Sequence, residues 1–453
     1  MMRHYTIGII HYKVGGTDGV SLEIEKWQRV LEEMGHTVHL CGGDLGTAEG
    51  FLIEELSHYR EDARRLDRST FKALVDYPDE AAYRATLYER AAVIEQRLRA
   101  FVAEKRIDFL IPQNVWSVAV NPPVAVAVAR VMRDLRLPAL AHNHDFYFER
   151  PHLTLTCKTA VDLADYYLPP RDPLARHVVI NSLAQLALRE RKGIEATVVP
   201  NVFDFDGPGW DPDAYNADFR QRIGLRPNDV FVLQATRIVA RKGIELAVDF
   251  VQALNHPAHR ARLQQRGFYD GRPFTAGSRI VLVLAGYAQD DTAGYTPKLK
   301  HKIERAGIDA LFVDDLIDAA RGMRDGQKVY SLWDSYIYAD FITYPSLWEG
   351  WGNQLLEALR AKLPLMLFEY PVYAADIGDK GLRAVSLGRE IAGHDDLGLV
   401  QVAPETIERA ADQAVDLLTD AALRRETVEH NFALGQQHYS LDSLRGYLAP
   451  FFA

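Results

Sequence analysis

The sequence has little cysteine and no repetitive segment. We find no fixed-period repeat and no low-complexity tract in its 453 residues, and its two cysteines are Cys41 and Cys157. Two thiols exclude a disulfide framework and a zinc site with four thiolate ligands. Both cysteines lie in apolar segments, so we predict that they are small buried thiols.

The sequence also lacks an excess of positive charge. It has 52 Lys and Arg residues against 62 Asp and Glu residues, which gives a net charge of −10. An acidic chain is a poor general binder of nucleic acid, although a local basic cleft that binds it remains an alternative. We therefore predict no nucleic-acid partner.

A long hydrophobic run is missing as well. The longest uncharged stretch, residues 109–129, contains three amide side chains and a Pro-Pro pair, so it is a poor bilayer span. The apolar run near the N-terminus is too short for the core of a signal peptide. We therefore predict a cytoplasmic protein that does not span a membrane, with a peripheral membrane contact as the open alternative.

The composition is typical of a soluble globular protein with more than one domain. Hydrophobic residues make up 48% of the chain and charged residues 25%. This composition excludes a disordered chain and a collagen-like chain. At this length, two or three domains are expected.

Strand-like and helix-like segments alternate along the chain. The first example is a strand at 5–11, a glycine-rich loop, an amphipathic helix at 20–34 and a strand at 37–41, which implies a parallel sheet. Further strands are predicted at 108–112, 138–141, 178–180, 196–199, 230–234, 279–285, 310–313, 340–344 and 364–367, and further helices at 123–133, 182–191, 244–254, 297–306 and 405–419. A segment rich in Pro, Gly and Asp at 200–212 interrupts the alternation. We therefore predict two doubly wound α/β domains that meet near residue 203.

Two glutamates flank a glycine-rich turn in the second half. Glu349 lies in the loop after the strand 340–344, and Glu357 lies about one turn into the following helix. The glycines let backbone N–H groups approach a phosphate, and the helix N-terminus adds positive potential. The carboxylate beyond the turn can accept hydrogen bonds from two ribose hydroxyls, and the one in the loop can bind a sugar hydroxyl.

A basic pair, Arg237 and Lys242, follows the strand 230–234 in a loop that opens a helix. Two cations that converge there suit a diphosphate leaving group. The reason is that negative charge grows on the diphosphate as the glycosidic bond to it breaks.

These motifs resemble those of a known family. The residues that carry the resemblance are Arg237, Lys242-Gly243, Glu349-Gly350-x-Gly352 and Glu357-Ala358. In this order and spacing they resemble the retaining, GT-B-fold glycosyltransferases of family 4, and the resemblance covers nearly the whole chain. It implies two Rossmann-like domains that face a cleft. Residues 1–203 would bind the acceptor and residues 204–430 the nucleotide sugar, with residues 431–453 returning to the first domain.

The resemblance implies roles for residues of the second half. Arg237 and Lys242 would stabilise the donor diphosphate. Glu357 would hold the ribose, and Glu349 would contact the donor sugar. Backbone or side-chain donors near the sugar and the β-phosphate would come from Gly352, Asn353, Gln354 and Leu355. Asn353-Gln354 replaces the commoner Leu-Pro, and Lys362 stands where glycine is usual, so the donor-sugar contacts are the least defined part of this prediction.

In the first half, the resemblance points to residues after the strands 5–11 and 138–141. His144 would face the donor sugar, and Asp145 would orient His144 or the acceptor. Gly15 and Gly16 match the loop that closes over the diphosphate and the acceptor. Asp18 could accept a hydrogen bond from a hydroxyl group of the acceptor. The alternatives are a surface loop or a His-x-His metal site for the histidines, and an ordinary tight turn for the glycines.

Three further groups have open alternatives. Val313 ends the strand 310–313, and Asp314-Asp315 follows it near where the family reads the base. A carboxylate there could favour guanine or simply be solvated. The Asp-x-Asp at 204–206 is predicted to be a turn rather than a metal site. Four arginines form either a solvated helix face or a site for an acceptor phosphate or carboxylate: Arg60, Arg64, Arg65 and Arg68.

The sequence therefore predicts a retaining glycosyltransferase. It would move a hexose from a nucleotide diphosphate sugar, with GDP-mannose favoured and a UDP-sugar next, to a small soluble sugar, polyol or sugar acid such as glucosylglycerate. The resemblance implies no protein nucleophile and no required cofactor or metal; stimulation by Mg²⁺ and a homo-oligomer stay open. The alternatives are a non-catalytic nucleotide-sugar-binding subunit and a GT-B epimerase.

Overall fold

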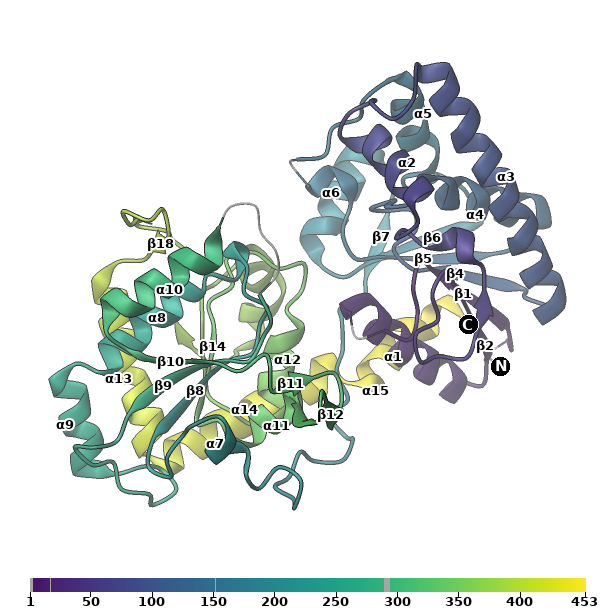
Figure 1. Ribbon diagram of the computed structural model, residues 1–453. Coiled ribbons are helices and arrows are strands. Elements are labelled where there is room, and N and C mark those ends of the chain that lie inside the picture. Colours follow the sequence, from purple (N-terminus) through teal and green to yellow (C-terminus); the bar gives the residue numbers. More distant parts are fainter. Residues whose placement is uncertain (1–2, 17, 151, 289–293) are drawn as a thin grey trace. The chain divides into compact units, whose positions relative to one another are not determined.

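The computed structural model divides the protein into two compact units (Figure 1). It describes residues 3–16, 18–150, 152–288 and 294–453. Unit 1 comprises Met1–Val202 and Leu441–Ala453, and unit 2 comprises Phe203–Ser440. Each unit has its own parallel sheet and its own hydrophobic core, so each is an α/β domain.

Unit 1 is built on a seven-stranded sheet in the order β3-β2-β1-β4-β5-β6-β7, in which neighbouring strands are parallel. Its strands are β1 (Thr6–His11), β2 (Thr37–Gly42), β3 (Phe51–Leu52), β4 (Phe109–Pro112), β5 (Ala139–Asn143), β6 (Ala175–Val179) and β7 (Ala196–Val198). Its helices are α1 (Gly19–Glu33), α2 (Glu61–Phe71), α3 (Glu80–Lys105), α4 (Pro122–Leu135), α5 (Lys158–Tyr167), α6 (Ser182–Lys192) and α15 (Leu441–Leu448). The chain runs outward from β1 to β3 and restarts at β4 on the other side of β1, as in a Rossmann-like sheet.

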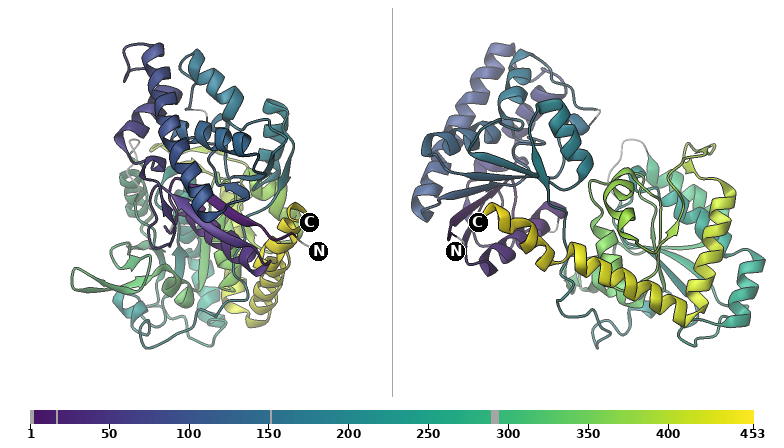
Figure 2. Two further views of the ribbon diagram at one scale, coloured as in Figure 1. Left: turned by 90° about the vertical axis from the view of Figure 1, so that its right-hand side faces the viewer. Right: turned by 180° about the vertical axis from the view of Figure 1, so that it is seen from behind.

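Helices cover both faces of this sheet. On one face, Ile7 and Ile9 of β1 share a core with Ile24 and Trp27 of α1 and with Leu444 of α15. On the other face, residues of β1 and β4 share a core with α3 and α4. Figure 2 shows α15 beside α1. The C-terminal segment therefore contributes to the core of unit 1.

Unit 2 is built on a six-stranded parallel sheet in the order β10-β9-β8-β14-β15-β16. Its strands are β8 (Val230–Gln234), β9 (Ile280–Leu284), β10 (Asp309–Phe312), β14 (Phe341–Tyr344), β15 (Leu365–Leu367) and β16 (Val385–Ser386). Its helices are α7 (Phe219–Arg222), α8 (Ile244–Leu254), α9 (Pro257–Arg266), α10 (Tyr295–Ala306), α11 (Leu332–Tyr338), α12 (Asn353–Arg360), α13 (Pro404–Thr419) and α14 (Ala421–Tyr439). Along the chain, β8 is the first strand of this sheet and β14 is the fourth. The two are neighbours, so the winding reverses at this pair.

Unit 2 carries two additions to this sheet. One is a three-stranded sheet of β11 (Ile317–Asp318), β13 (Gln327–Ser331) and β12 (Gly322–Arg324), and the other is the hairpin of β17 (Gly393–His394) and β18 (Val400–Gln401). Arg321 of the first addition lies 2.6 Å from Asp213 and also pairs with Asp334 of α11. These ion pairs fasten the small sheet to the segment before α7 and to α11.

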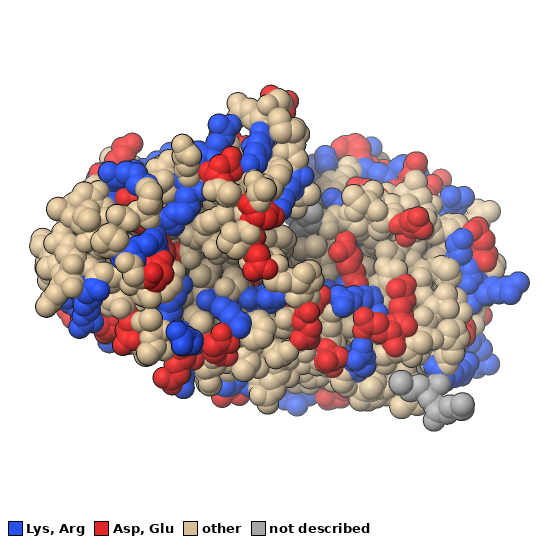
Figure 3. Space-filling view, turned by 90° about the horizontal axis from the view of Figure 1, so that it is seen from below, with Lys and Arg blue, Asp and Glu red and all other residues tan. Residues whose placement is uncertain are grey.

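The surface in view has mixed charge, and the described helices do not suit a bilayer. On the face in Figure 3, acidic and basic side chains are interspersed without an extended patch of either sign. Among the described residues, no helix is both long enough and apolar enough to cross a membrane.

The predicted α/β fold is confirmed, but the unit boundaries differ from the predicted ones. Unit 1 gives way to unit 2 after Val202, and the segment that returns to unit 1 begins at Leu441 rather than at residue 431. Asn431 lies in the middle of α14, where its Oδ1 accepts the Arg383 N–H (2.9 Å) and its Nδ2 donates to the Arg383 carbonyl (2.8 Å). Because these bonds hold the middle of α14 within unit 2, the chain returns to unit 1 only after this helix ends.

One of the two cysteines is less buried than predicted. Cys41 is fully buried in β2, as expected, whereas Cys157 is half-buried. Cys157 occupies the N-cap position of α5. A residue at a helix end is covered on fewer sides than one in a central strand, which accounts for the difference.

Candidate active site

The candidate donor site lies where the winding of the unit 2 sheet reverses. β8 and β14 are parallel neighbours, with Val232 beside Phe341 and Leu233 beside Ile342. In doubly wound sheets, the loops that leave such a pair of strands diverge and open a crevice for a ligand. The basic loop (235–243) and the glutamate loop (345–352) are the two loops that leave these strands. The fold therefore brings together the two motifs that the sequence singled out.

The two loops are in backbone contact. The Leu347 N–H donates to the Arg241 carbonyl at 2.9 Å. Gly243 has a φ of +57°, and a Cβ atom on it would lie 2.4 Å from the Pro345 carbonyl oxygen. Since any side chain there would collide with backbone, the close approach of the loops requires this glycine.

Glu349 is held by two cations of the basic loop. Lys242 Nζ donates to Glu349 Oε1, and Arg241 donates to Glu349 Oε2 at 2.9 Å. Lys242 Nζ also lies 3.4 Å from Gln354 Oε1, and the Arg241 guanidinium lies 5.9 Å from the Trp348 ring centroid. Lys242 is 3% exposed and Glu349 is 8% exposed. The ion pair is therefore shielded from water.

Burial and charge act in opposite directions on this pair. Burial lowers the pKa of Lys242, and the Glu349 carboxylate only partly restores it. Burial raises the pKa of Glu349, but the charges of Lys242 and Arg241 outweigh burial and hold it below its ordinary value. The charge of Arg237 also acts on Lys242. Two cations thus contact one carboxylate, and the charge of a third acts on Lys242. This surplus of positive charge suits a diphosphate.

Glu357 lies in the second turn of α12, where a tyrosine orients it. Its Oε2 accepts a hydrogen bond from Tyr336 Oη at 2.7 Å. The Tyr336 ring is packed against Trp210 and Trp333, with ring centroids 5.7 and 5.9 Å away. The aromatic packing fixes the tyrosine, and the tyrosine fixes one oxygen of the carboxylate that was predicted to hold the ribose.

The turn before α12 places four predicted residues at the helix N-terminus. Gly352 is the N-cap residue with a φ of +127°, and a Cβ atom on it would lie 2.3 Å from Tyr370 Oη. Leu355 is buried, and its N–H already donates to the Gly352 carbonyl at 2.9 Å. Asn353 and Gln354 occupy the first turn, where helix N–H groups have no partner within the helix. Their predicted contacts with the β-phosphate fit this position.

The residues predicted to read the base lie at the edge of the unit 2 sheet. Val313 follows the edge strand β10 and is buried, whereas the Asp314 side chain is exposed. Arg324 donates to the carbonyl oxygens of Asp314 (3.4 Å) and Asp315. The backbone of this segment is thus held in place, and the recognition of guanine by Asp314 stays a prediction.

The candidate site of unit 1 lies at the reversal between β1 and β4. His11 ends β1, and its Nδ1 lies 2.6 Å from the carbonyl oxygen of Gln113, which follows β4. His144 follows β5, and its N–H donates to Asn114 Oδ1 at 3.1 Å. The C-terminal ends of three neighbouring strands are therefore connected, with His144 among them.

The two aspartates predicted for this site both have protein partners. Asp145 accepts a hydrogen bond from Arg150 Nε at 2.9 Å. Asp18 caps α1, because its Oδ1 accepts the N–H groups of Val20 and Ser21, each at 3.1 Å. Contacts of these carboxylates with an acceptor stay predictions.

Gly15 and Gly16 lie in the turn after β1, and both make room for close neighbours. Gly15 has a φ of +66°, and a Cβ atom on it would lie 2.3 Å from the Leu45 carbonyl oxygen. A Cβ atom on Gly16 would lie 2.6 Å from Lys13 Cε. Packing within unit 1 thus requires Gly15, whereas at Gly16 only the flexible end of the Lys13 side chain would have to move. The closure of both glycines over a diphosphate stays a prediction.

Several histidines of unit 1 are buried and uncharged at neutral pH. Burial lowers the pKa of His11, His144 and His177 to about 4. His142 stacks on Trp27 with ring centroids 4.2 Å apart, and burial lowers its pKa well below the ordinary value. Nε2 of His144 is buried without a hydrogen-bond partner among the described residues. His144 can therefore meet a ligand as a neutral group.

These histidines predict that the protein loses stability in mild acid. Between pH 6.5 and about 4, His11, His144 and His177 bind protons in the unfolded chain but not in the folded one. The free energy of unfolding should therefore fall as the pH drops through this range, by up to about 1.4 kcal/mol per pH unit for each group. Thermal unfolding measured at pH 7, 6 and 5 should show a falling Tm. The fall in Tm with pH should be shallower in His177→Gln, whose amide can replace the bond to the Pro170 carbonyl. In the control His301→Gln, at an exposed position, it should be as steep as in the parent. An unchanged slope in His177→Gln would contradict this account.

No metal centre is evident in the part of the chain that the structure describes. No group of three or more His, Cys, Asp or Glu side chains is placed there to hold a metal ion. Within the Asp-x-Asp, Asp204 Oδ1 accepts the N–H groups of Asp206 (3.2 Å) and Gly207 (2.7 Å). The predicted turn is confirmed.

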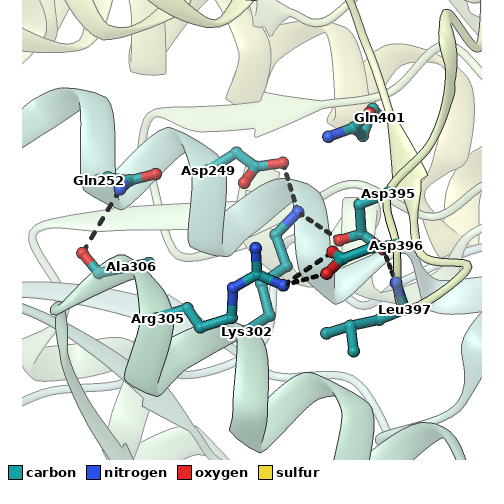
Figure 4. A pocket seen from close by; sticks show the side chains of 9 residues that line it. All are labelled: Asp249, Gln252, Lys302, Arg305, Ala306, Asp395, Asp396, Leu397 and Gln401. Carbon is teal, nitrogen blue, oxygen red and sulfur yellow. Dashed lines mark hydrogen bonds and ion pairs between the residues drawn. The ribbon is translucent and has the colours of Figure 1, made fainter.

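A separate cavity of about 220 Å³ in unit 2 is lined by α8, α10 and the β17–β18 hairpin (Figure 4). Lys302 lies 2.9 Å from Asp249 and 3.6 Å from Asp395, and Arg305 lies 2.7 Å from Asp396. The charges in its wall are thus paired with one another, and none of them belongs to the donor site.

Comparisons with known proteins identify the family. A scan against models of protein families finds no match. A mannosylglucosylglycerate synthase of Thermotoga maritima is 36% identical over 443 residues, which cover 98% of this chain and 98% of that protein. The chain belongs to the mannosylglucosylglycerate synthase family. The mannosylglucosylglycerate synthase of Petrotoga mobilis is 36% identical over 415 residues, 91% of this chain and 93% of that protein.

Solved structures also share the fold of this chain. The crystal structure of a glycosyltransferase from Rickettsia africae matches 99% of this chain and 98% of its own, with a TM-score of 0.60 and 13% identity. Such a likeness shows the fold, which is GT-B with two Rossmann-like domains. Membership in the family makes the chain a glycosyltransferase, as the sequence predicted, rather than a non-catalytic subunit or an epimerase.

The sequence analysis missed two residues of the donor site. One is Arg241, which donates to Glu349 at 2.9 Å. Its place beside Lys242 in the same loop was a signal, but spacing does not show which side chain turns toward the glutamate. Tyr336 had no local signal, because its contact with Glu357 joins residues that are separated by a strand and a loop.

Proposed function

We propose that this glycosyltransferase transfers mannose from GDP-mannose to glucosylglycerate with retention of the anomeric configuration. The observation that carries the proposal is the 36% identity to a mannosylglucosylglycerate synthase over 98% of both chains. The name of that relative describes a product in which mannose is joined to glucosylglycerate. The donor site of unit 2 supports the use of a nucleotide diphosphate sugar.

The donor diphosphate is assigned to the basic loop and to the start of α12. Arg237, Arg241 and Lys242 would stabilise the negative charge that grows on the diphosphate as its bond to the sugar breaks. The first-turn N–H groups of Asn353 and Gln354 would add hydrogen bonds to the β-phosphate. With three cations in one loop, a required metal ion is not part of the proposal.

The nucleoside is assigned to Glu357 and to the segment after β10. Glu357, oriented by Tyr336, would accept hydrogen bonds from the ribose hydroxyls. Val313 and Asp314 would meet the base, and the exposed Asp314 carboxylate could accept the N1–H and N2–H groups of guanine. This pairing favours GDP over UDP.

The proposed reaction uses no protein nucleophile. Glu349 is paired with two cations and its pKa lies below the ordinary value. Such a carboxylate is a weak base and a weak nucleophile, so we assign it to a hydroxyl of the donor sugar. The bond from the sugar C1 to the diphosphate would break, the acceptor oxygen would bond to C1 on the same face, and a diphosphate oxygen would take the acceptor proton. Exclusion of water limits hydrolysis of the donor.

Unit 1 is assigned to the acceptor and to one side of the donor sugar. The neutral imidazole of His144 would face the sugar, with Asp145 beside it. Gly15 and Gly16 would let the turn after β1 approach the diphosphate and the acceptor. Asp18 would accept a hydrogen bond from a hydroxyl group of the acceptor.

The test begins with binding and ends with the product. Calorimetric titration with GDP, UDP and ADP, each with and without Mg²⁺, should show GDP as the tightest ligand and little effect of the metal. The enzyme should then convert GDP-mannose and glucosylglycerate to a product whose new linkage is α by NMR, the configuration of the donor. A preference for UDP would overturn the assigned nucleotide, a β linkage would overturn retention, and no transfer to glucosylglycerate would overturn the acceptor.

A further inference from the structure

Two loops at the ligand-binding edge of the unit 1 sheet are bonded to one another. The β4 loop (113–121) follows β4, and the β5 loop (144–150) follows the neighbouring parallel strand β5. The Tyr147 N–H of the β5 loop donates to the Ser117 carbonyl of the β4 loop at 3.0 Å. Rossmann-like sheets bind ligands at the C-terminal ends of their strands. A residue that fixes these loops therefore acts on the candidate site of unit 1.

Asn114 makes three further bonds from the β4 loop to the segment that carries His144. Its backbone N–H donates to the His142 carbonyl at 2.7 Å. Its Oδ1 accepts the His144 N–H at 3.1 Å, and its Nδ2 donates to Asp145 Oδ1 at 3.4 Å. Oδ1 also accepts the Ser117 hydroxyl, so both acceptor positions of the amide oxygen are used. One side chain thus holds the main chain of one predicted site residue and the carboxylate of the next.

The backbone at this position explains why the residue is asparagine. Asn114 has a φ of +55°, in the left-handed region that residues other than glycine, asparagine and aspartate seldom adopt. Glycine would adopt it at the lowest cost but has no amide. Aspartate would place a second carboxylate against Asp145. Asparagine is the residue that tolerates this conformation, accepts from His144 and donates to Asp145.

The β4 loop gives Asn114 a rigid support. Tyr12, the residue directly after β1, donates from Oη to the Val115 carbonyl at 3.2 Å. Trp116 Nε1 donates to the Ala125 carbonyl of α4 at 3.0 Å. Val115 and Trp116 are both fully buried. Because the next two residues are fixed to β1 and to α4, the amide of Asn114 is held in one place.

The ring and the carboxylate of the segment have partners outside the β4 loop. The centroid of the His144 ring lies 4.3 Å from that of His142, and the His142 ring stacks on Trp27 at 4.2 Å. Asp145 Oδ2 accepts a hydrogen bond from Arg150 Nε at 2.9 Å. The bonds from the β4 loop complete this support, because they hold the main chain between the ring and the carboxylate.

We propose that Asn114 is a positioning residue of the transfer reaction and holds His144 and Asp145 in place through its side-chain amide. The inference rests on the proposed function, because that function assigns His144 to the donor sugar. Without the amide, the His144 N–H loses its acceptor and Asp145 loses one of its donors, so both side chains shift. A displacement of about 1 Å at a reacting centre can cost about 10²-fold in rate.

The experiment removes the amide in two ways. Asn114→Gly removes it and keeps the left-handed backbone, and Asn114→Asp keeps the size of the side chain and the acceptor for His144 but removes the donor to Asp145. The matched control is Arg136→Gly, because Arg136 also has a left-handed backbone (φ +54°) but lies exposed at the C-terminal end of α4. Transfer from GDP-mannose to glucosylglycerate, GDP affinity and Tm are measured for each variant, with all assays well below the Tm.

Both Asn114 variants should lower kcat by about 10- to 100-fold and leave GDP affinity unchanged, because the donor site of unit 2 keeps its contacts. Arg136→Gly should keep the kcat of the parent. Against a His144→Ala background, Asn114→Gly should cause a much smaller loss than in the parent, since Asn114 acts mainly through His144.

Two results would overturn the proposal. One is a kcat like that of the parent in Asn114→Gly. The other is an equal fold-loss in the parent and in the His144→Ala background, which is what a general loss of packing would give. If Asn114→Gly does not fold, Asn114→Asp, which keeps the packing of the side chain, is judged by the same two criteria.

A second readout does not depend on activity. The imidazole NMR signals of His144, identified by their loss in His144→Ala, should move in both Asn114 variants and stay in place in Arg136→Gly. If the parent does not transfer mannose to glucosylglycerate but the signals move in this way, the proposed function is wrong and the placement of His144 by Asn114 stands. If transfer occurs but the signals of Asn114→Gly match those of the parent, the positioning role is wrong and the function stands.

Discussion

Replacing Lys242 with alanine should lower kcat for mannosyl transfer by about 10²- to 10³-fold, the loss that follows removal of one preorganised donor to a developing charge. Lys242 is almost fully buried and contacts Glu349 and Gln354. In this position its ammonium group would be aimed at the bond between the sugar and the diphosphate. Arg237 and Arg241 would remain in the variant, so binding of the donor should suffer less than its turnover.

The assignment of Lys242 to the diphosphate can be tested by comparing two nucleotides. Calorimetry should show that Lys242→Ala weakens binding of GDP more than binding of GMP, because only GDP has a β-phosphate. Lys362→Ala is the matched control, since Lys362 is an exposed lysine of unit 2 that pairs with Glu429 at 2.9 Å. Unchanged turnover in Lys242→Ala, with an unchanged Tm, would remove Lys242 from the catalytic site.

Glu357→Gln should weaken GDP binding by about 10- to 100-fold, because the ribose hydroxyls would lose hydrogen bonds to a charged acceptor. The amide keeps the size of the side chain and can still accept from Tyr336. Tyr336→Phe should cause a smaller loss, since it removes the group that orients the carboxylate (2.7 Å) and leaves the charge in place.

Deleting the ribose hydroxyls from the ligand identifies their partner. With 2′,3′-dideoxy-GDP, the parent enzyme should bind more weakly, and Glu357→Gln should cause little further loss. Equal effects of the substitution on GDP and on the dideoxy nucleotide would show that Glu357 does not bind the ribose. A large fall in Tm for Glu357→Gln would instead indicate a role in the packing of α12.

The most apolar elements could be predicted from the sequence with few errors. β8 (Val230–Gln234) and α8 (Ile244–Leu254) have the predicted bounds, because both are short apolar runs that are buried on nearly all sides. The long helix α3 was not predicted. Its buried residues recur at helical spacing along 26 positions, but alanines and other uncharged residues are mixed with the charged ones between them, which weakens the contrast between its two faces. The strands β11, β12, β17 and β18 have two or three residues each, too few for a hydrophobic pattern.

The order of residues along the chain was enough to recognise the GT-B glycosyltransferase and to predict a candidate donor site whose two loops the fold brings together. The basic loop, the glycines and the two glutamates are local motifs, and a parallel α/β sheet places the ends of its strands at one edge. Which side chains meet at that edge depends on contacts between distant segments. The contact of Arg241 with Glu349 is of this kind, and so is the ion pair of Arg65 with Asp76. So is the fastening of Asn431 to Arg383, which holds α14 in unit 2. Spacing in the sequence gives a residue its element and its face, whereas its partner is set by the packing of elements that are far apart in the chain.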